Sequence, residues 1–491
     1  MGGLAALALA LALVLAAESA SALSPVGGEF QVNTYTSCNQ RNPAVSGLAS
    51  GGFVVVWASG SPAFQQDGSY SGIFGQRFDA EGNSVGAEFR SNQTTFDEQT
   101  DPDVAGLPNG GFVVVWNSYG QDGPYYYGVF GRRHNANGST AGGEFQVNTY
   151  TIYGQYYPAV AATPGGFVVV WESCEQDGSR EGIFGQRFDT SGDRVGTEFQ
   201  ANTFTEGRQR FPDISADANG NFVVVWDSEP LEGGPEQDGS GAGIFGQRYN
   251  ADGSKTGAEF PVNTYTTDNQ FLPAVAHAPD GSFLVTWEGR RPQGGNPFLS
   301  DDVNVRRFAA NGMPQGDDFI ANSYTSAFEE DVAIAFAGGE FLVAWETEND
   351  GVTGTDDDSE GAFARRLSVT GQALGTEFQA NTFTVDEQDD PRVAGLTGGG
   401  FAVVWESSYQ DGDQLGVYAQ VYSGGVCGDG TQDGRVTAGD ALFALQAAIG
   451  SSTCKTCVCD VNKSGGINAS DALLTLQSAV GQGVVLDCVV C

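Results

Sequence analysis

Short apolar runs recur along the chain, and glycine, asparagine or aspartate flanks most of them. The most regular run has the form GGFVVVW, and it ends at a tryptophan. Its apolar residues are continuous, which predicts a strand covered on both faces. It occurs seven times, at intervals of 55 to 61 residues, which indicates an internal repeat. The tryptophans that end it are Trp57, Trp116, Trp171, Trp226, Trp287, Trp345 and Trp405.

Each repeat contains four short segments rich in β-branched and aromatic residues, which predict strands. In the third repeat these are residues 144–151, 158–163, 165–171 and 182–189. The last of them, GIFGQRFD, alternates apolar and polar residues, which predicts a strand nearer an exposed edge. The sequence DTSGD at 189–193 supplies a glycine for a hairpin turn. We therefore expect the fourth segment to pair antiparallel with the EF segment of the next repeat.

A unit of four strands cannot bury both of its faces alone, but radial stacking of such units can. The sequence therefore predicts an all-β seven-bladed β-propeller. Residues 29–36 are expected to complete the last blade beside residues 416–422, so that both ends of the repeat region close the ring. An open β-solenoid is the alternative, although it would not need complementary ends. The tryptophans are expected to fill the space between blades.

Several polar residues recur at fixed places in the repeat. An amide side chain can satisfy backbone groups between strands, and Asp-Gly favours a tight turn. The alternative is a repeated ligand pocket, or a ring of carboxylates that binds cations or sugar hydroxyls. The densest acidic run, residues 350–360, is expected to be a solvated loop, with a calcium site as the alternative. The recurring residues are Asp67, Asp122, Asp177, Asp238, Asp350 and Asp411; Asn33, Asn92, Asn148, Asn202, Asn263, Asn322 and Asn381; and Gln40, Gln99, Gln155, Gln209, Gln270 and Gln388.

The repeats resemble those of secreted bacterial proteins built from EFQVNT, FVVVW and GIFGQRFD units, over residues 28–422. That resemblance implies a propeller-like extracellular domain and names no substrate. Residues 1–22 are expected to be a secretory signal peptide, because an apolar run leads into the small-residue site at 20–22; an uncleaved anchor is the alternative. We thus expect residues 23–424 to form the propeller of a secreted or cell-surface protein.

Six of the eight cysteines lie in the last 65 residues, which predicts a small disulfide-stapled module in residues 425–491. The pairing stays open, and a zinc site is the rival interpretation, although neither histidine lies nearby. These cysteines are Cys427, Cys454, Cys457, Cys459, Cys488 and Cys491. The other two, Cys38 and Cys174, are either bridged or buried thiols.

The same module contains two 12-residue loops, 31 residues apart, that each run into a helical pattern. Oxygen-bearing residues stand at the positions from which a calcium loop coordinates its ion, with glycine at position 6. The first loop offers three carboxylates and the second two, so we expect the first to bind calcium more tightly; the alternative is a helical hairpin with vestigial loops. The expected ligands are Asp429, Thr431, Asp433, Arg435 through its carbonyl, Thr437 and Asp440, and then Asp460, Asn462, Ser464, Gly466, Asn468 and Asp471.

This duplicated loop and helix resembles a type I dockerin, over residues 427–484. The resemblance implies a small all-α domain folded around two calcium ions, and attachment to a cohesin-like partner or surface scaffold. Two features depart from the family pattern. The residues at positions 10 and 11 are Ala438-Gly439 and Ala469-Ser470 instead of the common Ser-Thr pair, and the six cysteines are additional.

The net charge of −39 argues against nucleic acid and anionic membranes as partners. Catalytic motifs are absent from the sequence, and His134 and His277 occupy unrelated places in their repeats. Because the blades look nearly identical, we expect a non-catalytic protein that binds glycan or protein. We also expect it to be a monomer. The alternative is a dockerin-bearing glycoside hydrolase, which asymmetric inward-facing carboxylates would favour.

Overall fold

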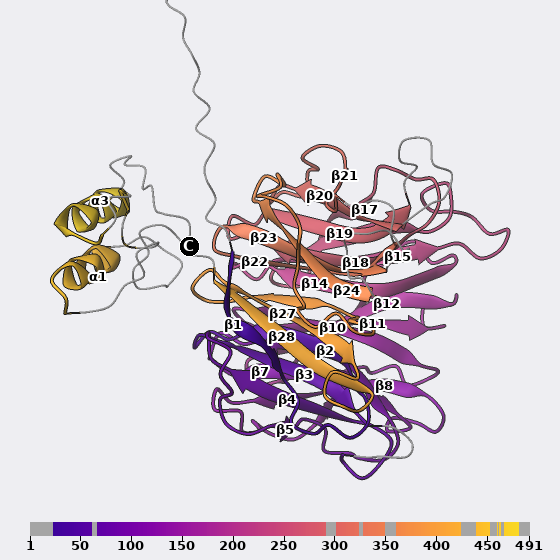
Figure 1. The fold of residues 1–491 in the computed structure, drawn as a ribbon. Helices are drawn as coiled ribbons and strands as arrows, with labels where there is room; N and C mark the ends of the chain where they lie inside the picture. The colour runs from indigo at the N-terminus through magenta and orange to yellow at the C-terminus, as the bar shows by residue number, and fades with distance from the viewer. Residues whose placement is uncertain are drawn as a thin grey trace, which may run out of the picture.

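The computed structural model describes residues 23–60, 66–290, 301–323, 328–348, 360–423, 438–451, 459, 461–462 and 466–480. Within these residues the strands form seven four-stranded antiparallel sheets. Figure 1 shows the sheets arrayed as the blades of a propeller. The fold is therefore a seven-bladed β-propeller, as the repeats predict.

Each blade runs outward from the channel in the order of its strands. Blade 1 contains β2 (Gln40–Gly47), β3 (Phe53–Ser59), β4 (Gly72–Phe78) and β5 (Phe89–Arg90). Blade 2 contains β6 (Gln99–Gly106), β7 (Phe112–Tyr119), β8 (Tyr127–His134) and β9 (Phe145–Gln146). Blade 3 contains β10 (Gln155–Thr163), β11 (Gly166–Cys174), β12 (Glu181–Asp189) and β13 (Arg194–Gln200). Blade 4 contains β14 (Arg208–Ala216), β15 (Phe222–Glu229), β16 (Gly243–Tyr249) and β17 (Lys255–Pro261).

The remaining blades follow the same plan, except that the last one takes its outer strand from the start of the chain. Blade 5 contains β18 (Gln270–His277), β19 (Phe283–Arg290), β20 (Asp301–Phe308) and β21 (Phe319–Ile320). Blade 6 contains β22 (Phe328–Ala337), β23 (Glu340–Glu348), β24 (Glu360–Ser368) and β25 (Phe378–Gln379). Blade 7 contains β26 (Arg392–Gly395), β27 (Phe401–Ser408), β28 (Leu415–Ser423) and β1 (Ser24–Gln31).

The ring is closed by strands from both ends of the repeat region. β1 pairs antiparallel with β28, and the Val32 amide donates to the Val417 carbonyl at 2.8 Å (Figure 1). The inner strand β26 also contacts β2 of blade 1. The predicted closure is confirmed and the open solenoid is excluded, although the closing strand covers residues 24–31 instead of 29–36.

The second strand of each blade is the core of the protein. The tryptophan side chains are 0–1% exposed and pack against the preceding blade, as Trp57 does against Ala402 and Val404. Burying a side chain of this kind stabilises the fold by about 1.5–3 kcal/mol or more. The predicted role of the tryptophans as core between blades is confirmed.

The third strand is more buried than its alternating sequence predicts. In β4 only Arg77 is partly exposed. Gln76 is buried, and its amide donates to the Arg77 carbonyl at 2.8 Å. The expected exposed edge lies one strand farther out, because β5 covers β4 and the neighbouring blade covers its face.

The recurring amides and Asp-Gly pairs hold the connections between strands. Asn202 accepts the Ile183 amide at 2.9 Å and donates to Gln209 Oε1 at 3.0 Å and to Asp177 Oδ2 at 3.2 Å. Asp177 Oδ1 in turn accepts the Ser179 amide at 3.1 Å, closing its own turn. At Asn202, Gln209 and Asp177, the prediction that these side chains satisfy backbone groups and tight turns is therefore confirmed.

The C-terminal residues that the structure describes include two helices, α1 (Ala438–Ala448) and α3 (Ala469–Ala479), which pack against each other. Ala444, Cys459 and Ala472 form their small buried core. Cys459 is disulfide-bonded. Cys38 and Cys174 are free thiols, so they are not bridged to each other. None of the described helices is long and apolar enough to cross a membrane. Residues 1–22, the expected signal peptide, lie outside the described residues.

Closure of the ring can be tested at Asn33, which accepts the Val417 amide at 2.8 Å and donates to Gln40 Oε1 at 2.9 Å. Asn33→Ala would leave these buried groups unpaired, and we expect the free energy of unfolding to fall by about 1–3 kcal/mol. Asn202→Ala, the same change inside blade 3, is the matched control and should cost a similar amount in urea denaturation. A silent Asn33→Ala beside a destabilising Asn202→Ala would mean that the termini do not pair.

Candidate functional site at the channel mouth

In six of the seven blades the inner strand contains a β-bulge where it reaches the mouth of the central channel; in blade 7 the corresponding residue, Asp390, lies just before β26. The register of strand pairing shifts at each bulge, for example between Arg41 and Ala44. A residue with positive φ occupies this position in all seven blades, and proline follows it in six of them. Side-chain-bearing residues rarely adopt this conformation, so seven of them in one ring mark a constrained site. They are Asn42, Asp101, Tyr157, Phe211, Leu272, Asp331 and Asp390, with φ between 47° and 54°.

Carboxylates of the preceding blade hold most of these bulges. The residue after each tryptophan lies beside the next blade, and in five blades it is acidic. Glu406 accepts the Asn42 amide at 2.5 Å, and Glu288 accepts the Asp331 amide at 2.6 Å. Glu346 accepts the amide of Asp390 in the same way at 3.3 Å. Equivalent bonds join Glu172 to Phe211 and Asp227 to Leu272.

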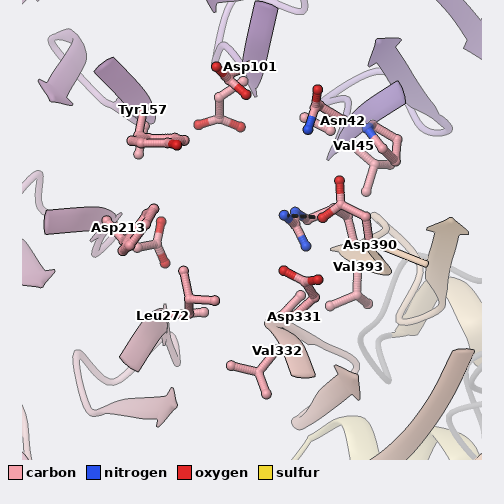
Figure 2. Close-up of a pocket in the computed structure, with 18 of the residues that line it drawn as sticks. Asn42, Val45, Asp101, Tyr157, Asp213, Leu272, Asp331, Val332, Asp390 and Val393 are labelled. Carbon is pink, nitrogen blue, oxygen red and sulfur yellow. Dashed lines mark ion pairs between the residues drawn. The ribbon is translucent and has the colours of Figure 1, made fainter. Parts of the chain in front are cut away.

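The seven bulge residues divide into two chemically different arcs. The polar arc consists of Asp331, Asp390, Asn42 and Asp101, which come from blades 6, 7, 1 and 2 in order around the ring. The apolar arc consists of Tyr157, Phe211 and Leu272, from blades 3 to 5. Figure 2 shows Tyr157 and Leu272 on one side of the cavity and Asp331, Asp390 and Asn42 on the other. The repeat symmetry of the core therefore ends at the channel mouth.

The two arcs line a cavity of about 630 Å³, within the range of small-molecule sites. A second layer lies two residues farther along each inner strand. It is alanine in four blades, but Asp103, Asp213 and Arg392 occupy it in the others. Figure 2 shows the Asp213 carboxylate pointing into the cavity.

Arg392 and Asp390 form an ion pair with Nη2 and Oδ1 2.5 Å apart (Figure 2). Burial raises the pKa of Asp390 to about 6 even though Arg392 favours its charged form. Burial also raises the pKa of Glu406 to about 8, and its protonated side chain hydrogen-bonds Asp390. For Arg392, burial is outweighed by the surrounding carboxylates, Asp390 first, so its pKa is raised and it stays charged.

Asp101 is the carboxyl group whose surroundings best suit proton donation. Its Oδ2 accepts bonds from Asn117 Nδ2 at 2.8 Å and Thr100 Oγ1 at 3.0 Å, which fix the side chain and leave Oδ1 for a ligand. Burial, the largest effect, raises its pKa. Asp101 also borders the apolar arc, since burial raises the pKa of Tyr157 and the charge of Asp101 raises it further.

Asp103 and Asp213 connect neighbouring blades. Asp103 Oδ2 accepts the Val160 amide, and Asp213 Oδ2 accepts the Val275 amide, each at 2.7 Å. Burial raises the pKa of Asp103 to about 6 and that of Asp213 to about 7. Both bonds are structural, and the raised pKa values bring the titration of both carboxyl groups toward neutral pH.

A second acidic group lies between blades 6 and 7. Oxygen atoms of Glu346, Glu360 and Asp389 lie within 4.8 Å of one another. Burial and mutual repulsion raise the pKa of Asp389 to about 9 and that of Glu346 to about 10. At neutral pH this cluster therefore retains protons. The acidic run at 350–360, which was expected to be a solvated loop, lies outside the described residues except for Glu360.

Part of the expected calcium loops is described. Asp440 and Asp471, at position 12 of the two loops, are both fully buried at the starts of α1 and α3. Asp471 Oδ2 accepts the Asn468 amide at 2.8 Å, and Asn468 caps α3. The side-chain Nδ2 of Asn468 donates to the Gly466 carbonyl at 3.0 Å. Of the other expected ligands, Asn462 is also among the described residues. The rest lie outside the described residues: Asp429, Thr431, Asp433, Arg435, Thr437, Asp460 and Ser464.

Sequence reasoning missed the channel-mouth ring. It followed the residues that recur, whereas these residues differ from blade to blade. The recurring proline of the inner strand was the available signal, because the varied residue immediately precedes it. His134 and His277, in contrast, are packed against Phe112 and Phe283 outside the cavity, and burial lowers the pKa of each to about 4.

No known family model and no curated protein matches this chain. Among solved structures it is similar to a protein of unknown function from Dyadobacter fermentans, with 10% identity, a TM-score of 0.48, and coverage of 82% of this chain and 99% of that one. It is also similar to an α-L-arabinanase from Penicillium chrysogenum, with 14% identity, a TM-score of 0.43 and coverage of 80% and 98%. An α-L-arabinofuranosidase from Fusarium graminearum is also similar, with 11% identity, a TM-score of 0.44, and coverage of 81% of this chain and 98% of that one. At these identities and TM-scores the likeness does not indicate a ligand or a reaction.

The buried carboxyl groups predict a propeller that is more stable in mild acid. The pKa of Glu406 rises from 4.5 to about 8 because the folded protein buries it. Its contribution to stability is therefore complete below pH 4.5 and is lost as the pH rises through 8. Glu406→Gln keeps an oxygen for the Asn42 amide but cannot ionise. Between pH 5 and 8 we expect the unfolding temperature of the variant to fall by several degrees less than that of the wild type. Equal pH slopes in thermal melts would contradict this assignment, and Asp193→Asn, an exposed turn residue, serves as control.

Proposed function

We propose that the protein is a secreted glycoside hydrolase that acts on a neutral polysaccharide at the channel mouth. The observation that carries this proposal is the division of the bulge ring into a polar arc and an apolar arc. A ring built only to close the propeller would have no reason to differ from blade to blade.

This asymmetry favours the enzyme over the non-catalytic binding protein that the sequence suggested. That expectation rested on the near identity of the blades. Their cores are alike, but Asp101, Asp331 and Asp390 have no acidic counterpart at the bulges of blades 3 to 5. Carboxyl groups gathered on one side of a cavity meet the first requirement of glycoside hydrolysis.

The chemistry of the two arcs suits a neutral sugar. Tyr157 and Phe211 offer aromatic faces to the apolar side of a sugar ring, and carboxylates accept hydrogen bonds from its hydroxyl groups. The surplus of carboxylates over the single Arg392 would repel an anionic glycan. A neutral polysaccharide is therefore the substrate class that the cavity favours.

Two carboxyl groups can be assigned roles in hydrolysis. Asp101, with its raised pKa and unengaged Oδ1, would donate a proton to the leaving glycosidic oxygen as its bond to the anomeric carbon breaks. Asp331, which points into the cavity beside Arg392, would act as the carboxylate partner, either by activating water or by attacking the anomeric carbon (Figure 2). Water supplies the oxygen that ends on the anomeric carbon.

We expect the full chain to release reducing sugar from at least one polymer in a panel of arabinan, arabinoxylan, galactomannan and β-glucan. Asp101→Asn and Asp331→Asn should each lower this rate by about 100-fold or more, because each removes one partner of the acid–base pair. Both variants should still bind the polymer in affinity electrophoresis.

Asp193→Asn, far from the cavity in a surface turn, is the control and should keep full activity. Binding of a polymer without any release of sugar by the wild type would restore the non-catalytic interpretation. Unchanged activity in both channel variants would show that hydrolysis takes place elsewhere.

We also propose that the C-terminal helices form a calcium-dependent attachment module. The described donors, Asp440, Asn462, Asn468 and Asp471, all offer oxygen, the ligand atom that calcium prefers. Exposed apolar residues recur on both helices with the same 31-residue spacing as the loops, and they support a docking role toward a cohesin-like protein. They are Leu442 and Leu445 on α1 with Ile449 just after it, and Leu473 and Leu476 on α3 with Val480 just after it.

Calorimetric titration of the calcium-stripped full chain should reveal two unequal calcium sites. Asp440→Asn should remove the tighter one and Asp471→Asn the weaker one, since each change deletes a buried carboxylate of one loop. Asp193→Asn should leave both sites intact. Failure of the wild type to take up calcium would refute this second proposal without affecting the first.

A further inference from the structure

Tyrosine is concentrated at one boundary of the propeller. Eight of the 16 tyrosines lie between residues 119 and 157, in blades 2 and 3. The corresponding loop of blade 3, QDGSREG at 176–182, has none. The repeat architecture therefore does not require them. They are Tyr119, Tyr125, Tyr126, Tyr127, Tyr150, Tyr153, Tyr156 and Tyr157.

Four of these rings form a line of successive contacts that ends in the cavity. The ring centroids of Tyr119 and Tyr127 are 5.1 Å apart, and those of Tyr127 and Tyr156 are 5.4 Å apart. The line continues from Tyr156 to Tyr157 at 6.4 Å and from Tyr157 to Phe211 at 4.9 Å. Its last two members belong to the apolar arc, and Tyr157 projects into the cavity in Figure 2.

Two further tyrosines, close to members of this line in the sequence, make a second aromatic contact on the loops. Tyr126 and Tyr153, from adjacent blades, make an edge contact with centroids 5.7 Å apart. Tyr125 beside them is 79% exposed, and Phe96 and Ile152 are also exposed. Exposed aromatic groups that join a cavity are typical of a binding surface. We call the path from Tyr125 to Phe211 the aromatic track.

The rings of the track are held in place. A Cβ atom on Gly154 would lie 2.2 Å from the Tyr156 hydroxyl, so only glycine leaves room for that ring. Tyr127 donates its hydroxyl to Glu98 Oε2 at 2.5 Å. These constraints reduce the entropy that the track would lose on binding an extended ligand.

We propose that the aromatic track binds the part of a long neutral polysaccharide that extends from the channel mouth across blades 2 and 3. This inference rests on the proposed function for its substrate class and adds the direction in which the chain runs. Sugar rings and aromatic faces stack without any charge, and Glu98 and the tyrosine hydroxyls can bond sugar hydroxyls.

Continuity with the cavity distinguishes this occupant from a proline-rich peptide, which also docks on aromatic grooves. A peptide would gain nothing from a track that leads to Asp101 and the polar arc. A polysaccharide would have one of its linkages carried to those carboxyl groups.

The test compares long and short ligands on the full chain. In the Asp331→Asn background, which prevents degradation, Tyr126→Ala/Tyr153→Ala should weaken binding of the polymer about tenfold or more in affinity electrophoresis. Binding of a trisaccharide from the same polymer should change less than twofold in calorimetry, because it fills only the cavity. The four polymers named above are the probes.

Two matched variants make the result specific. Tyr70→Ala alters the equivalent loop of blade 1, where the tyrosine is 44% exposed, and should leave polymer binding unchanged. Tyr126→Phe/Tyr153→Phe should retain it, because stacking remains. The proposal that the track binds polysaccharide would be overturned if the double alanine variant bound the polymer as well as its Asp331→Asn parent. It would also be overturned if the wild type bound none of the polymers. Binding that depends on the track, without hydrolysis by the wild type, would uphold it and refute only the catalytic proposal.

Discussion

Burial of the second strand between two blades is the constraint on which this structure depends. A single four-stranded sheet leaves the faces of runs such as Phe53–Trp57 open to water, and only a neighbouring blade can cover them. The same requirement applies at the last blade, so the chain must bring β1 back to β28. Closure of the ring therefore follows from the hydrophobic effect acting on every blade equally.

Equal blades create a second demand at the channel, where seven inner strands converge. In every blade the chain bends there at a residue with positive φ, which lies in a bulge in six of them, and an acidic side chain of the preceding blade holds most of these residues. Since the backbone and the holding carboxylate fix the geometry, the bulge side chain itself is free to vary. The framework can thus present aspartate in one blade and phenylalanine in another without disturbing the core.

The features of the fold that every repeat shares could be predicted from the sequence. The seven Trp positions predicted the blades, the EF segment at the start predicted closure, and the role of residues such as Asn202 and Asp177 followed from backbone needs. The site was not predictable in this way, because Tyr157 and Asp331 occupy the same position in their blades and share no chemistry. Positive φ at a bulge also leaves no clear sequence signal when tyrosine, leucine and aspartate all adopt it.

Charge at the channel explains why the site would work best as a unit. Arg392 is the one cation in the cavity lining, and it faces several carboxyl groups that burial would otherwise keep protonated. Its pairing with Asp390 offsets part of the burial effect that raises the pKa of that carboxyl group to about 6, whereas Asp101 and Asp213, whose pKa values burial also raises, lie outside that pair. Carboxyl groups with different protonation states in one cavity are what acid–base chemistry requires. The apolar arc adjoins this group, because Tyr157 is the bulge residue of the blade that follows that of Asp101, and burial is the largest effect that raises the pKa of both side chains.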